Sequence, residues 1–288
     1  MRAFVPAYQL ISAANLPEAL GLLAGEPGFW QPFAGGTDLM VLLEAGKLAH
    51  KNYLNIWNHG ELRGIEVAGE HISLGALTTY TEVQAHPTLR EEFPMLCQAA
   101  SETGGLAIQN RGTLGGNIVN ASPAADSPPA LLAYNAEVEL LSVRGSRWVP
   151  YKTFHLGYKE TAMQPDELLS RIRLPRLWPD AIHYYRKVGT RKAQAISKIC
   201  LAATARMNDG IVDMIRIALG SVAPVPLRCA KTEEVLQGAK LDDGAIARAR
   251  ETLSKEIVPI DDIRSTRDYR LRVSMNVLEN FLRQLTAA

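Results

Sequence analysis

Two Gly-Gly pairs, Gly35-Gly36 and Gly115-Gly116, are the residues of this sequence best suited to bind a ligand. Glycine permits positive φ angles and close approach of the backbone, and free N–H groups at the start of a helix can bind a phosphate oxygen. Thr113 and Asn117 add side chains that can form hydrogen bonds at the second pair. Two such turns from distant parts of the chain are suited to clamp the two phosphates of one pyrophosphate. Each pair could also be a simple tight turn, and neither matches the Gly-x-Gly-x-x-Gly of a Rossmann site.

A basic and aromatic segment, residues 184–198, is the third unusual feature, with two tyrosines and five basic residues. Such a mixture is typical of nucleic-acid contact, and a Lys- and Arg-rich edge strand is the alternative. The whole chain has a formal net charge of +1, from 31 basic and 30 acidic residues. This balance argues against nucleic-acid binding and against an anionic membrane surface.

The sequence carries no motif for a metal site or a catalytic nucleophile. Its three cysteines, Cys97, Cys200 and Cys229, are too few for a four-thiolate cluster, and its six histidines show no metal-ligand spacing. We predict no metal ligand and no catalytic acid, base or nucleophile. The sequence predicts a cytoplasmic protein with no membrane span. Its cysteines are few and widely spaced, it has no apolar segment of roughly 20 residues, and residues 1–10 lack the apolar run of a secretion signal.

The elements that must position the first glycine pair form a small strand–helix–strand unit. A helix over 15–24, with Asn15 as its N-cap, precedes a short strand over 29–33. The glycine pair follows this strand and precedes a helix over 39–45, and a second strand is expected over 53–57.

The second glycine pair lies in a Gly-rich segment over 108–121, among short helices and hairpins. The expected neighbours are a hairpin within 61–77, a helical region over 78–101 interrupted near Pro87 and Pro94, a helix over 127–133, a hairpin of 138–143 with 148–151, and a strand over 168–174. Residues 174–180, with two prolines, are the best linker candidate. Beyond it we expect strand, turn at 208–210 and strand over 181–223, then helices over 231–238, 243–256 and 266–286.

Taken together, these segments resemble the FAD-binding motifs of the molybdenum hydroxylase family. The resembling segments are 33–39, 110–118, 121–127, the flavin-edge stretch 185–198, and the C-terminal stretches 219–228 and 262–270. They occur in the family's order, over residues 4 to 284. The likeness is greatest for the separate FAD-binding, or medium, subunit of xanthine dehydrogenase and carbon monoxide dehydrogenase type enzymes.

The resemblance implies an α+β fold in two domains. Residues 1–176 would form an FAD-binding domain of the p-cresol methylhydroxylase/vanillyl-alcohol oxidase type, with subdomains over 1–57 and 58–176. Residues 177–288 would form a smaller C-terminal α+β domain with a three-stranded antiparallel sheet and a helical bundle.

The resemblance also implies which residues bind FAD. The pyrophosphate residues would be Ala34, Gly35, Gly36, Thr37, Asp38 and Leu39 at the first turn and Thr113, Leu114, Gly115, Gly116 and Asn117 at the second, with Gln31, Pro32 and Phe33 lining the same groove. Asp126 would accept hydrogen bonds from ribityl or ribose hydroxyls, with Asn120 and Ser122 nearby. Leu169 would pack near the flavin, Lys187 would lie at the isoalloxazine ring, and Ile196 would lie against its face.

Plainer interpretations of three of these residues stay open. Lys187 could form a surface pair with Arg191, and Leu169 and Ile196 could be ordinary core residues. Gln109 departs from the family pattern, because many relatives carry an arginine there. No role that needs a cation at this position is therefore implied.

The implied function is electron transfer. In the family, a large subunit holds a molybdenum cofactor where the substrate is hydroxylated, and a small subunit holds two [2Fe-2S] clusters. This chain would take electrons from the nearer cluster onto FAD and pass them to an external acceptor such as NAD+, oxygen, a quinone or a cytochrome. It lacks the cysteine-rich insertion of relatives with a [4Fe-4S] cluster, so FAD is the one cofactor implied. The implied assembly with the two other subunits is a heterotrimer or its dimer.

Three alternatives remain: a stand-alone FAD-dependent oxidoreductase, an RNA-binding module built on 184–198, and a scaffold subunit without FAD. The substrate is left open by the sequence as a purine, an aldehyde, carbon monoxide or an N-heteroaromatic compound.

Overall fold

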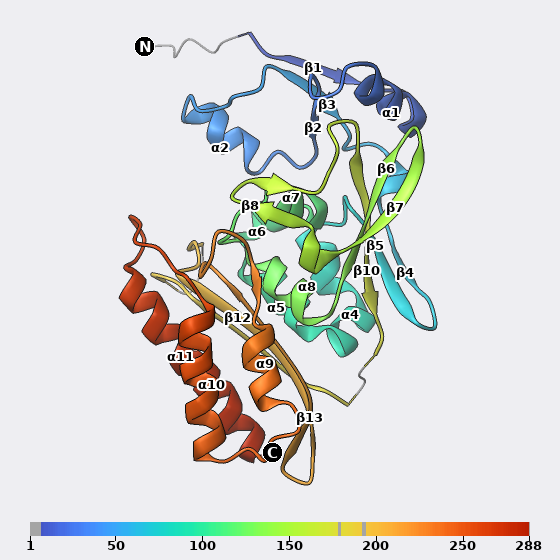
Figure 1. The fold of residues 1–288 in the computed structure, drawn as a ribbon. Coiled ribbons are helices and arrows are strands. Elements are labelled where there is room, and N and C mark those ends of the chain that lie inside the picture. Colours follow the sequence, from blue (N-terminus) through green and yellow to red (C-terminus); the bar gives the residue numbers. More distant parts are fainter. Residues whose placement is uncertain (1–6, 178–179, 192–193, 288) are drawn as a thin grey trace.

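The computed structural model describes residues 7–177, 180–191 and 194–287, which form three parts that follow one another along the chain (Figure 1). The first part is a parallel sheet in the order β1 (Gln9–Ser12), β3 (Asn52–Asn55), β2 (Gln31–Phe33), with helices α1 (Leu16–Gly25) and α2 (Leu39–Glu44). The strand–helix–strand unit predicted from the sequence is β2, α2 and β3. Strand β1 is an addition that the sequence did not predict.

Helix α1 forms where it was predicted and for the predicted reason. The Asn15 side chain accepts a hydrogen bond from the Glu18 N–H at 2.9 Å and caps the helix. The buried side chains of α1 pack in a small core cluster with Leu54 of β3 and Leu168. Because Leu168 belongs to the neighbouring sheet, this cluster joins the first part to the second.

The second part is built on an antiparallel sheet in the order β4-β5-β10-β6-β7. Its strands are β4 (Ile65–Val67), β5 (His71–Gly75), β6 (Glu137–Ser142), β7 (Gly145–Pro150) and β10 (Leu168–Pro175), with a separate hairpin of β8 (His155–Gly157) and β9 (Glu160–Thr161). Its helices are α3 (Tyr80–Ala85), α4 (Pro87–Glu92), α5 (Pro94–Glu102), α6 (Leu106–Gln109), α7 (Leu114–Val119) and α8 (Ser127–Ala133), with short 3-10 turns at Gly60–Leu62 and Tyr151–Thr153. Pro87 and Pro94 begin α4 and α5, so the predicted interruptions are confirmed.

The third part is an antiparallel sheet in the order β11 (Ile182–Val188), β12 (Ile199–Asn208), β13 (Ile211–Gly220), β14 (Leu227–Arg228). Helices α9 (Ala230–Leu236), α10 (Asp243–Glu256) and α11 (Arg267–Ala287) lie against one face of it (Figure 1). The three long strands match the expected three-stranded sheet, and the two-residue β14 adds a short fourth strand. The turn predicted at 208–210 joins β12 to β13, with Asp209 and Gly210 at positive φ.

Strand β12 contributes to two cores. Ile199, Leu201 and Ala203 belong to the cluster beneath the C-terminal helices, whereas Cys200 and Ala202 belong to the large central cluster. This alternation follows from the two-residue period of a strand. Small side chains face the centre, and α8 contacts β12 and β13 there. One core therefore spans residues on both sides of the expected linker, and the division into 1–176 and 177–288 stays a prediction.

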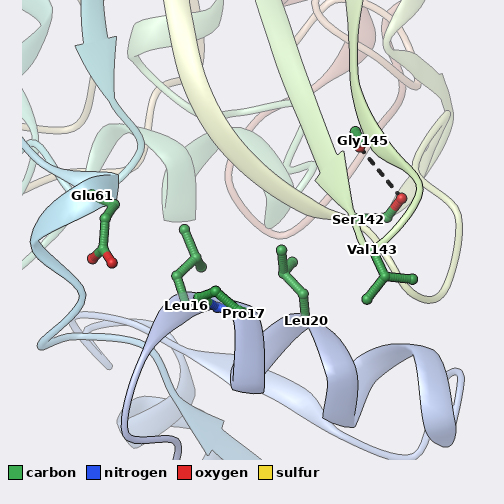
Figure 2. Close-up of a pocket in the computed structure, with 7 residues that line it drawn as sticks. All are labelled: Leu16, Pro17, Leu20, Glu61, Ser142, Val143 and Gly145. Carbon is green, nitrogen blue, oxygen red and sulfur yellow. Dashed lines mark hydrogen bonds between the residues drawn. The ribbon is translucent and has the colours of Figure 1, made fainter.

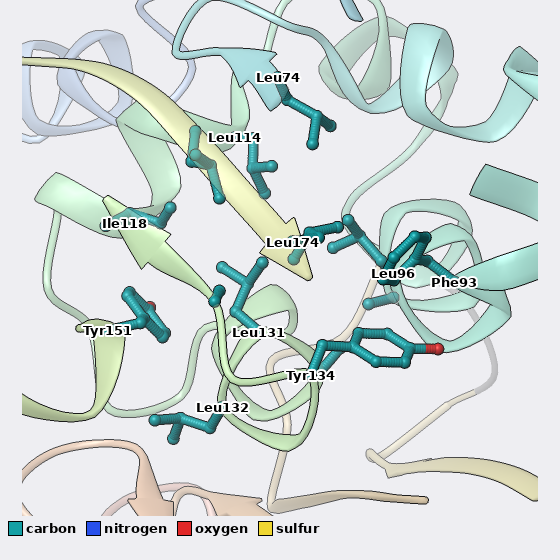
Figure 3. Close-up of a cluster of buried hydrophobic side chains, with 14 of the residues drawn as sticks. Leu74, Phe93, Leu96, Leu114, Ile118, Leu131, Leu132, Tyr134, Tyr151 and Leu174 are labelled. Carbon is teal, nitrogen blue, oxygen red and sulfur yellow. The ribbon is translucent and has the colours of Figure 1, made fainter. Parts of the chain in front are cut away.

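The large central cluster lies between the second and third sheets (Figure 3). It includes Leu74 from β5, Leu96 from α5 and Leu131 from α8. Phe93 and Tyr134 meet edge to face, with 5.0 Å between their ring centroids. Helices α5 and α8 are thereby enclosed between two sheets.

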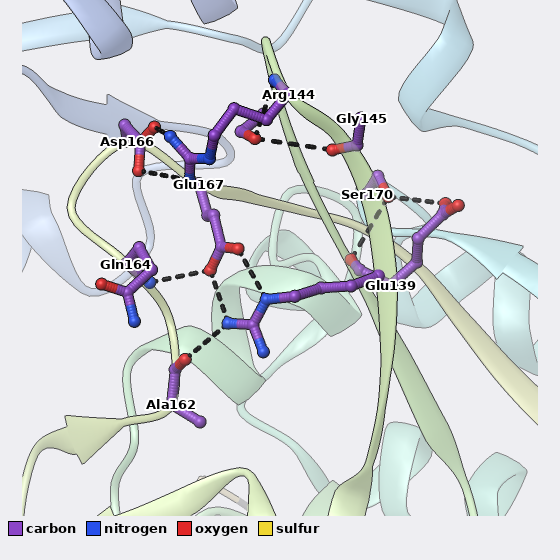
Figure 4. Close-up of polar contacts among 10 residues, drawn as sticks. Glu139, Arg144, Gly145, Ala162, Gln164, Asp166, Glu167 and Ser170 are labelled. Atoms are coloured by element: carbon purple, nitrogen blue, oxygen red, sulfur yellow. Dashed lines mark hydrogen bonds and ion pairs between the residues drawn. The ribbon is translucent and has the colours of Figure 1, made fainter.

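Ion pairs hold the loop before β10 against the β6–β7 hairpin (Figure 4). Arg147 donates to Glu167 from Nε and Nη2, at 2.7 and 2.8 Å, and Arg144 pairs with Asp166. Burial alone would raise the pKa of Glu167, but bonds from Arg147 and the Gln164 N–H hold that pKa below its usual range. These contacts fix the start of β10.

Truncation of Leu131 tests whether the central cluster is a core shared by the second and third parts. Leu131 is fully buried, so Leu131→Ala should lower the free energy of unfolding by about 2–5 kcal/mol. Denaturant unfolding should remain one transition by circular dichroism, because both sheets contact the cluster. Leu156→Ala, at a side chain 60% exposed, is the control and should cost less than about 0.5 kcal/mol. Two separate transitions would contradict a shared core.

His183 makes the stability depend on pH. Its Nδ1 lies 3.2 Å from the Tyr134 hydroxyl, and burial lowers the pKa of His183 below 6.5. As the pH falls, His183 takes up a proton in the unfolded chain before it does so in the folded chain. The contribution of the neutral His183 to the free energy of unfolding is therefore complete above about pH 6.5 and is lost below it. His183→Gln should therefore show a smaller drop in unfolding temperature than the unchanged protein between about pH 7 and about pH 5. Equal drops would rule out this role for His183.

Candidate functional site

The first glycine turn leaves β2 and leads into α2. Gly36 has a φ of +76°, and a Cβ at this position would lie 2.6 Å from the Phe33 ring, so glycine is required. The N–H groups of Gly35, Gly36 and Thr37 make no hydrogen bond to any other described part of the chain. The turn is half-buried rather than enclosed, so these donors are available to an anion.

The first glycine turn packs against the backbone just before the second turn. A Cβ on Gly35 would lie 1.7 Å from the carbonyl oxygen of Arg111, which leaves no room for any side chain. Arg111 and Gly112 directly precede the second turn, so the structure brings together the two segments singled out in the sequence. The other predicted residues of the first segment are Gln31, Pro32, Ala34 and Leu39, all half-buried, and the exposed Asp38, whose side chain does not cap α2.

The second turn is held by bonds within the chain. The N–H groups of Leu114 and Gly115 donate to the carbonyls of Thr78 and Ala76, both at 2.9 Å. The Gly116 N–H donates to the Thr113 hydroxyl at 3.1 Å, which caps α7. The donors of this turn are thus already in use, unlike those of the first.

Two features of the second turn still fit a ligand. Gly116 is exposed, and a Cβ on it would meet only the Thr113 hydroxyl within 4 Å. The Asn117 Oδ1 is buried and has no hydrogen-bond partner among the described residues. A buried amide oxygen without a partner is uncommon, and the hydroxyl of Tyr80 lies within reach of the Asn117 side chain.

Asp126 and Lys187 form a buried ion pair with each other. The Lys187 Nζ lies 2.7 Å from the Asp126 Oδ2 and donates to the Glu102 carbonyl at 2.8 Å, and the two side chains are only 5% and 10% exposed. The Ser197 hydroxyl donates to the Asp126 Oδ1 at 2.6 Å. Burial raises the pKa of Asp126, and Lys187 and Ser197 oppose that rise. A carboxylate has about four acceptor sites, so Asp126 keeps part of its capacity for ligand hydroxyls.

Asn120 and Ser122 both form hydrogen bonds within the chain, Asn120 with a neighbouring hairpin and Ser122 within its own loop. Lys159, on the tip of the β8–β9 hairpin, donates to the Asn120 carbonyl and Oδ1 at 2.7 and 2.5 Å. The Ser122 hydroxyl accepts from the Ala124 N–H at 3.3 Å. Both residues lie in the segment between α7 and Asp126, so they shape the path of the chain from the second turn to the ion pair.

Leu169 and Ile196 lie in different environments. Leu169 is 5% exposed and belongs to the large central cluster, as the core interpretation requires. Ile196 is 54% exposed on the segment that joins β11 to β12, so it is not an ordinary core residue. Its neighbour Gln194 lies close to Gly105, where a Cβ would be 2.9 Å from the Gln194 amide nitrogen.

Sequence reasoning missed two arginines that stack on the ring of Trp57, which follows β3. The guanidinium of Arg111 lies 3.8 Å above the Trp57 ring, and that of Arg63 lies 4.3 Å from the same ring. Arg111 stood within the resembling segment 110–118, and this was the one signal for it. Ser197 likewise stood within the resembling stretch 185–198, whereas Lys159 had no such signal, since its partner Asn120 is distant in sequence.

A pocket of 540 Å³ lies between α1 and the β6–β7 turn, lined by residues that include Leu16, Leu20 and Val143 (Figure 2). None of the predicted site residues lines it. Within the described ranges, no three His, Cys, Asp or Glu side chains gather as a metal site. No helix of the described chain is both long and apolar enough to cross a membrane.

Comparison with known proteins gives matches over nearly the whole chain. Residues 6–177 match the family described as FAD binding domain in molybdopterin dehydrogenase, and residues 183–285 match the CO dehydrogenase flavoprotein C-terminal domain. A xanthine dehydrogenase FAD-binding subunit of Escherichia coli O157:H7 is 32% identical over 280 residues, covering 96% of this chain and 95% of that protein. The glyceraldehyde dehydrogenase medium chain of Sulfolobus acidocaldarius is 31% identical over 270 residues, covering 94% and 95%.

Solved structures agree with these relatives. A chain of carbon monoxide dehydrogenase from Hydrogenophaga pseudoflava superposes with a TM-score of 0.92 at 27% identity, and 96% of each chain is covered. A chain of quinoline 2-oxidoreductase from Pseudomonas putida 86 gives 0.90 at 26% identity, covering 98% of this chain and 97% of that one. This chain belongs to the medium subunits of the xanthine dehydrogenase and carbon monoxide dehydrogenase type of molybdenum hydroxylase, and its cofactor is FAD.

Proposed function

We propose that this chain transfers electrons from an iron–sulfur partner subunit to an external acceptor by means of bound FAD. The first glycine turn supports this function most directly, because the N–H groups of Gly35, Gly36 and Thr37 have no partner among the described residues. Gly35 also packs against the backbone of Arg111, which lies just before the second turn. Successive backbone N–H groups at a helix start are a common binding site for a pyrophosphate.

The residues of the chain bind and orient the cofactor. The first turn would donate to phosphate oxygens, and Gly116 would permit close approach of the second turn. Asp126 would accept from sugar or ribityl hydroxyls with its remaining lone pairs, and Lys187 would place a positive charge near the ring. When bound, FAD supplies one- and two-electron chemistry. No side chain of this chain is proposed as an acid, base or nucleophile.

The proposed partners are a large subunit with a molybdenum cofactor and a small subunit with [2Fe-2S] clusters, in a cytoplasmic complex. Several relatives are named medium chain or FAD-subunit, which implies further subunits in those proteins. Another matched structure is described as a Cu,Mo-CO dehydrogenase, which names molybdenum in that enzyme. NAD+, oxygen, a quinone or a cytochrome would be the acceptor.

Anaerobic reduction distinguishes a partnered subunit from a stand-alone oxidoreductase. The purified chain loaded with FAD should bind it in a ratio near one to one and should show no bleaching of its visible absorbance with a purine, an aldehyde, carbon monoxide or an N-heteroaromatic compound. The assembled complex should bleach with one of these substrates. Bleaching of the isolated chain by a substrate would favour the stand-alone alternative. An isolated chain and a complex that both refuse FAD would overturn the proposal.

Gly116→Val tests the pyrophosphate site without disturbing a packed glycine. A Cβ there meets one atom within 4 Å, the Thr113 hydroxyl at 2.8 Å, which caps α7 and must shift slightly. The unfolding temperature is therefore recorded beside the affinity, and the added methyl groups are expected to block approach of the cofactor. The dissociation constant of FAD, measured by fluorescence titration, should rise at least about tenfold, or about 1.4 kcal/mol. Gly21→Val is the matched control, because Gly21 is also an exposed helical glycine and a Cβ there meets nothing within 4 Å. Equal affinities for both variants would exclude the second turn from the site.

A further inference from the structure

We propose that Arg270 is a positioning residue for the flavin site, acting through the segment that carries Ser197. This inference rests on the proposed FAD site around Asp126. Arg270 lies in the first turn of α11, and its hydrogen bonds go to Lys198, Ser221 and Asp262 and not to either glycine turn. Its effect would pass through hydrogen bonds to the backbone and not through contact with the cofactor.

Arg270 is a buried cation that fastens three separate segments. It is 3% exposed. Its Nη1 donates to the carbonyls of Lys198 and Ser221, at 3.0 and 2.9 Å, and its Nη2 donates to the Asp262 Oδ1 at 2.7 Å. Only its Nε lacks a partner among the described residues. A charge this deeply buried must be paired and hydrogen-bonded, so the three segments are held at fixed positions around one planar guanidinium.

Ser221 carries the connection onward to Ser197. Ser221 has a φ of +65°, a left-handed conformation that is uncommon for a non-glycine residue and persists where the surroundings enforce it. Its N–H donates to the Pro123 carbonyl at 2.7 Å, and its hydroxyl donates to the Ser197 carbonyl at 3.0 Å. Arg270 and Ser221 therefore bind the consecutive carbonyls of Lys198 and Ser197.

Ser197 completes the path to the site. Its hydroxyl donates to the Asp126 Oδ1, and Lys187 holds the other oxygen of the same carboxylate. The path from Arg270 to Asp126 is thus continuous and runs entirely through hydrogen bonds of 3.0 Å or less. Loss of the guanidinium fork would release both Ser221 and Lys198, and Asp126 would lose its fixed orientation toward the ligand.

A purely structural role makes a different prediction from a positioning role. If Arg270 only stabilises the C-terminal part, its replacement lowers the unfolding temperature but leaves the folded chain with normal affinity for FAD. If it positions Asp126, affinity and the environment of the flavin change even where the chain stays folded. Supporting groups of this kind commonly change ligand affinity by about 10–100-fold at metal sites, and we expect a rise of the FAD dissociation constant of about tenfold.

The experiment compares full-length variants, with Arg270→Lys and Asp262→Asn as the test pair. Lysine keeps the charge but offers one donor head in place of the fork. Asparagine keeps an oxygen for the N–H groups of Arg264 and Ser265, which bind Asp262, and removes its charge. Arg250→Lys is the matched control, because Arg250 pairs with Glu279 between α10 and α11 and has no contact with the path. Each protein is titrated with FAD, and its visible circular dichroism with bound flavin and its unfolding temperature without FAD are recorded.

Weaker FAD binding and an altered flavin dichroism in the test pair, with the control unchanged, would support the positioning role. Test variants with FAD affinity within twofold of the unchanged protein would overturn it, whatever their unfolding temperatures. If Arg270→Lys fails to fold, the result for Asp262→Asn decides. Failure of the unchanged full chain and its complex to bind FAD would instead overturn the proposed function and this inference with it, so the two failures are distinguishable.

Discussion

The buried ion pair between Lys187 and Asp126 is the interaction on which the arrangement of this protein depends most. Lys187 lies in β11 of the third part, and Asp126 directly precedes α8 of the second. Taking two such charges out of water costs several kcal/mol per ion, and only good geometry with complete hydrogen bonding offsets this cost. Ser197 and the Glu102 carbonyl provide those bonds. The end of α5, the start of α8 and the edge of the third sheet must therefore all meet at one point.

Backbone contact sets a second constraint, and it separates the roles of the two glycine turns. The N–H groups of Leu114 and Gly115 are bonded to Thr78 and Ala76, so the second turn is fixed by the second part of the chain. The first turn rests against Arg111, and the N–H groups of Gly35 and its two successors find no partner in the described chain. One turn is thus a rigid support, while the other presents donors. A pair of similar sequence motifs has two different physical tasks.

Local structure could be predicted well because its causes are local. The cap at Asn15, the helix starts at Pro87 and Pro94, and the turn at 208–210 each depend on a few neighbouring residues. Strand β1 was missed because its four residues carry no turn signal, and it is defined by pairing with β3. The glycine turns were singled out from the conformational freedom of glycine, whereas Asp126 was named from the family resemblance. The bonds from Ser197 to Asp126 and from Lys159 to Asn120 join residues far apart in sequence, and no local pattern encodes them.

Strand β12 packs on both of its faces, and this packing links the C-terminal helices to the region around Asp126. The positions of side chains far from Asp126 therefore matter even though no acid, base or nucleophile is proposed. Leu201 and its alternate neighbours pack beneath the C-terminal helices, while Cys200 and Ala202 face α8. Ser197 lies just before this strand and holds Asp126. Because protein interiors are densely packed, a displacement of the helices cannot be absorbed locally and would move β12 as a unit. The C-terminal part therefore shares a core with the second part, and through Ser197 it supports Asp126 of the proposed cofactor site.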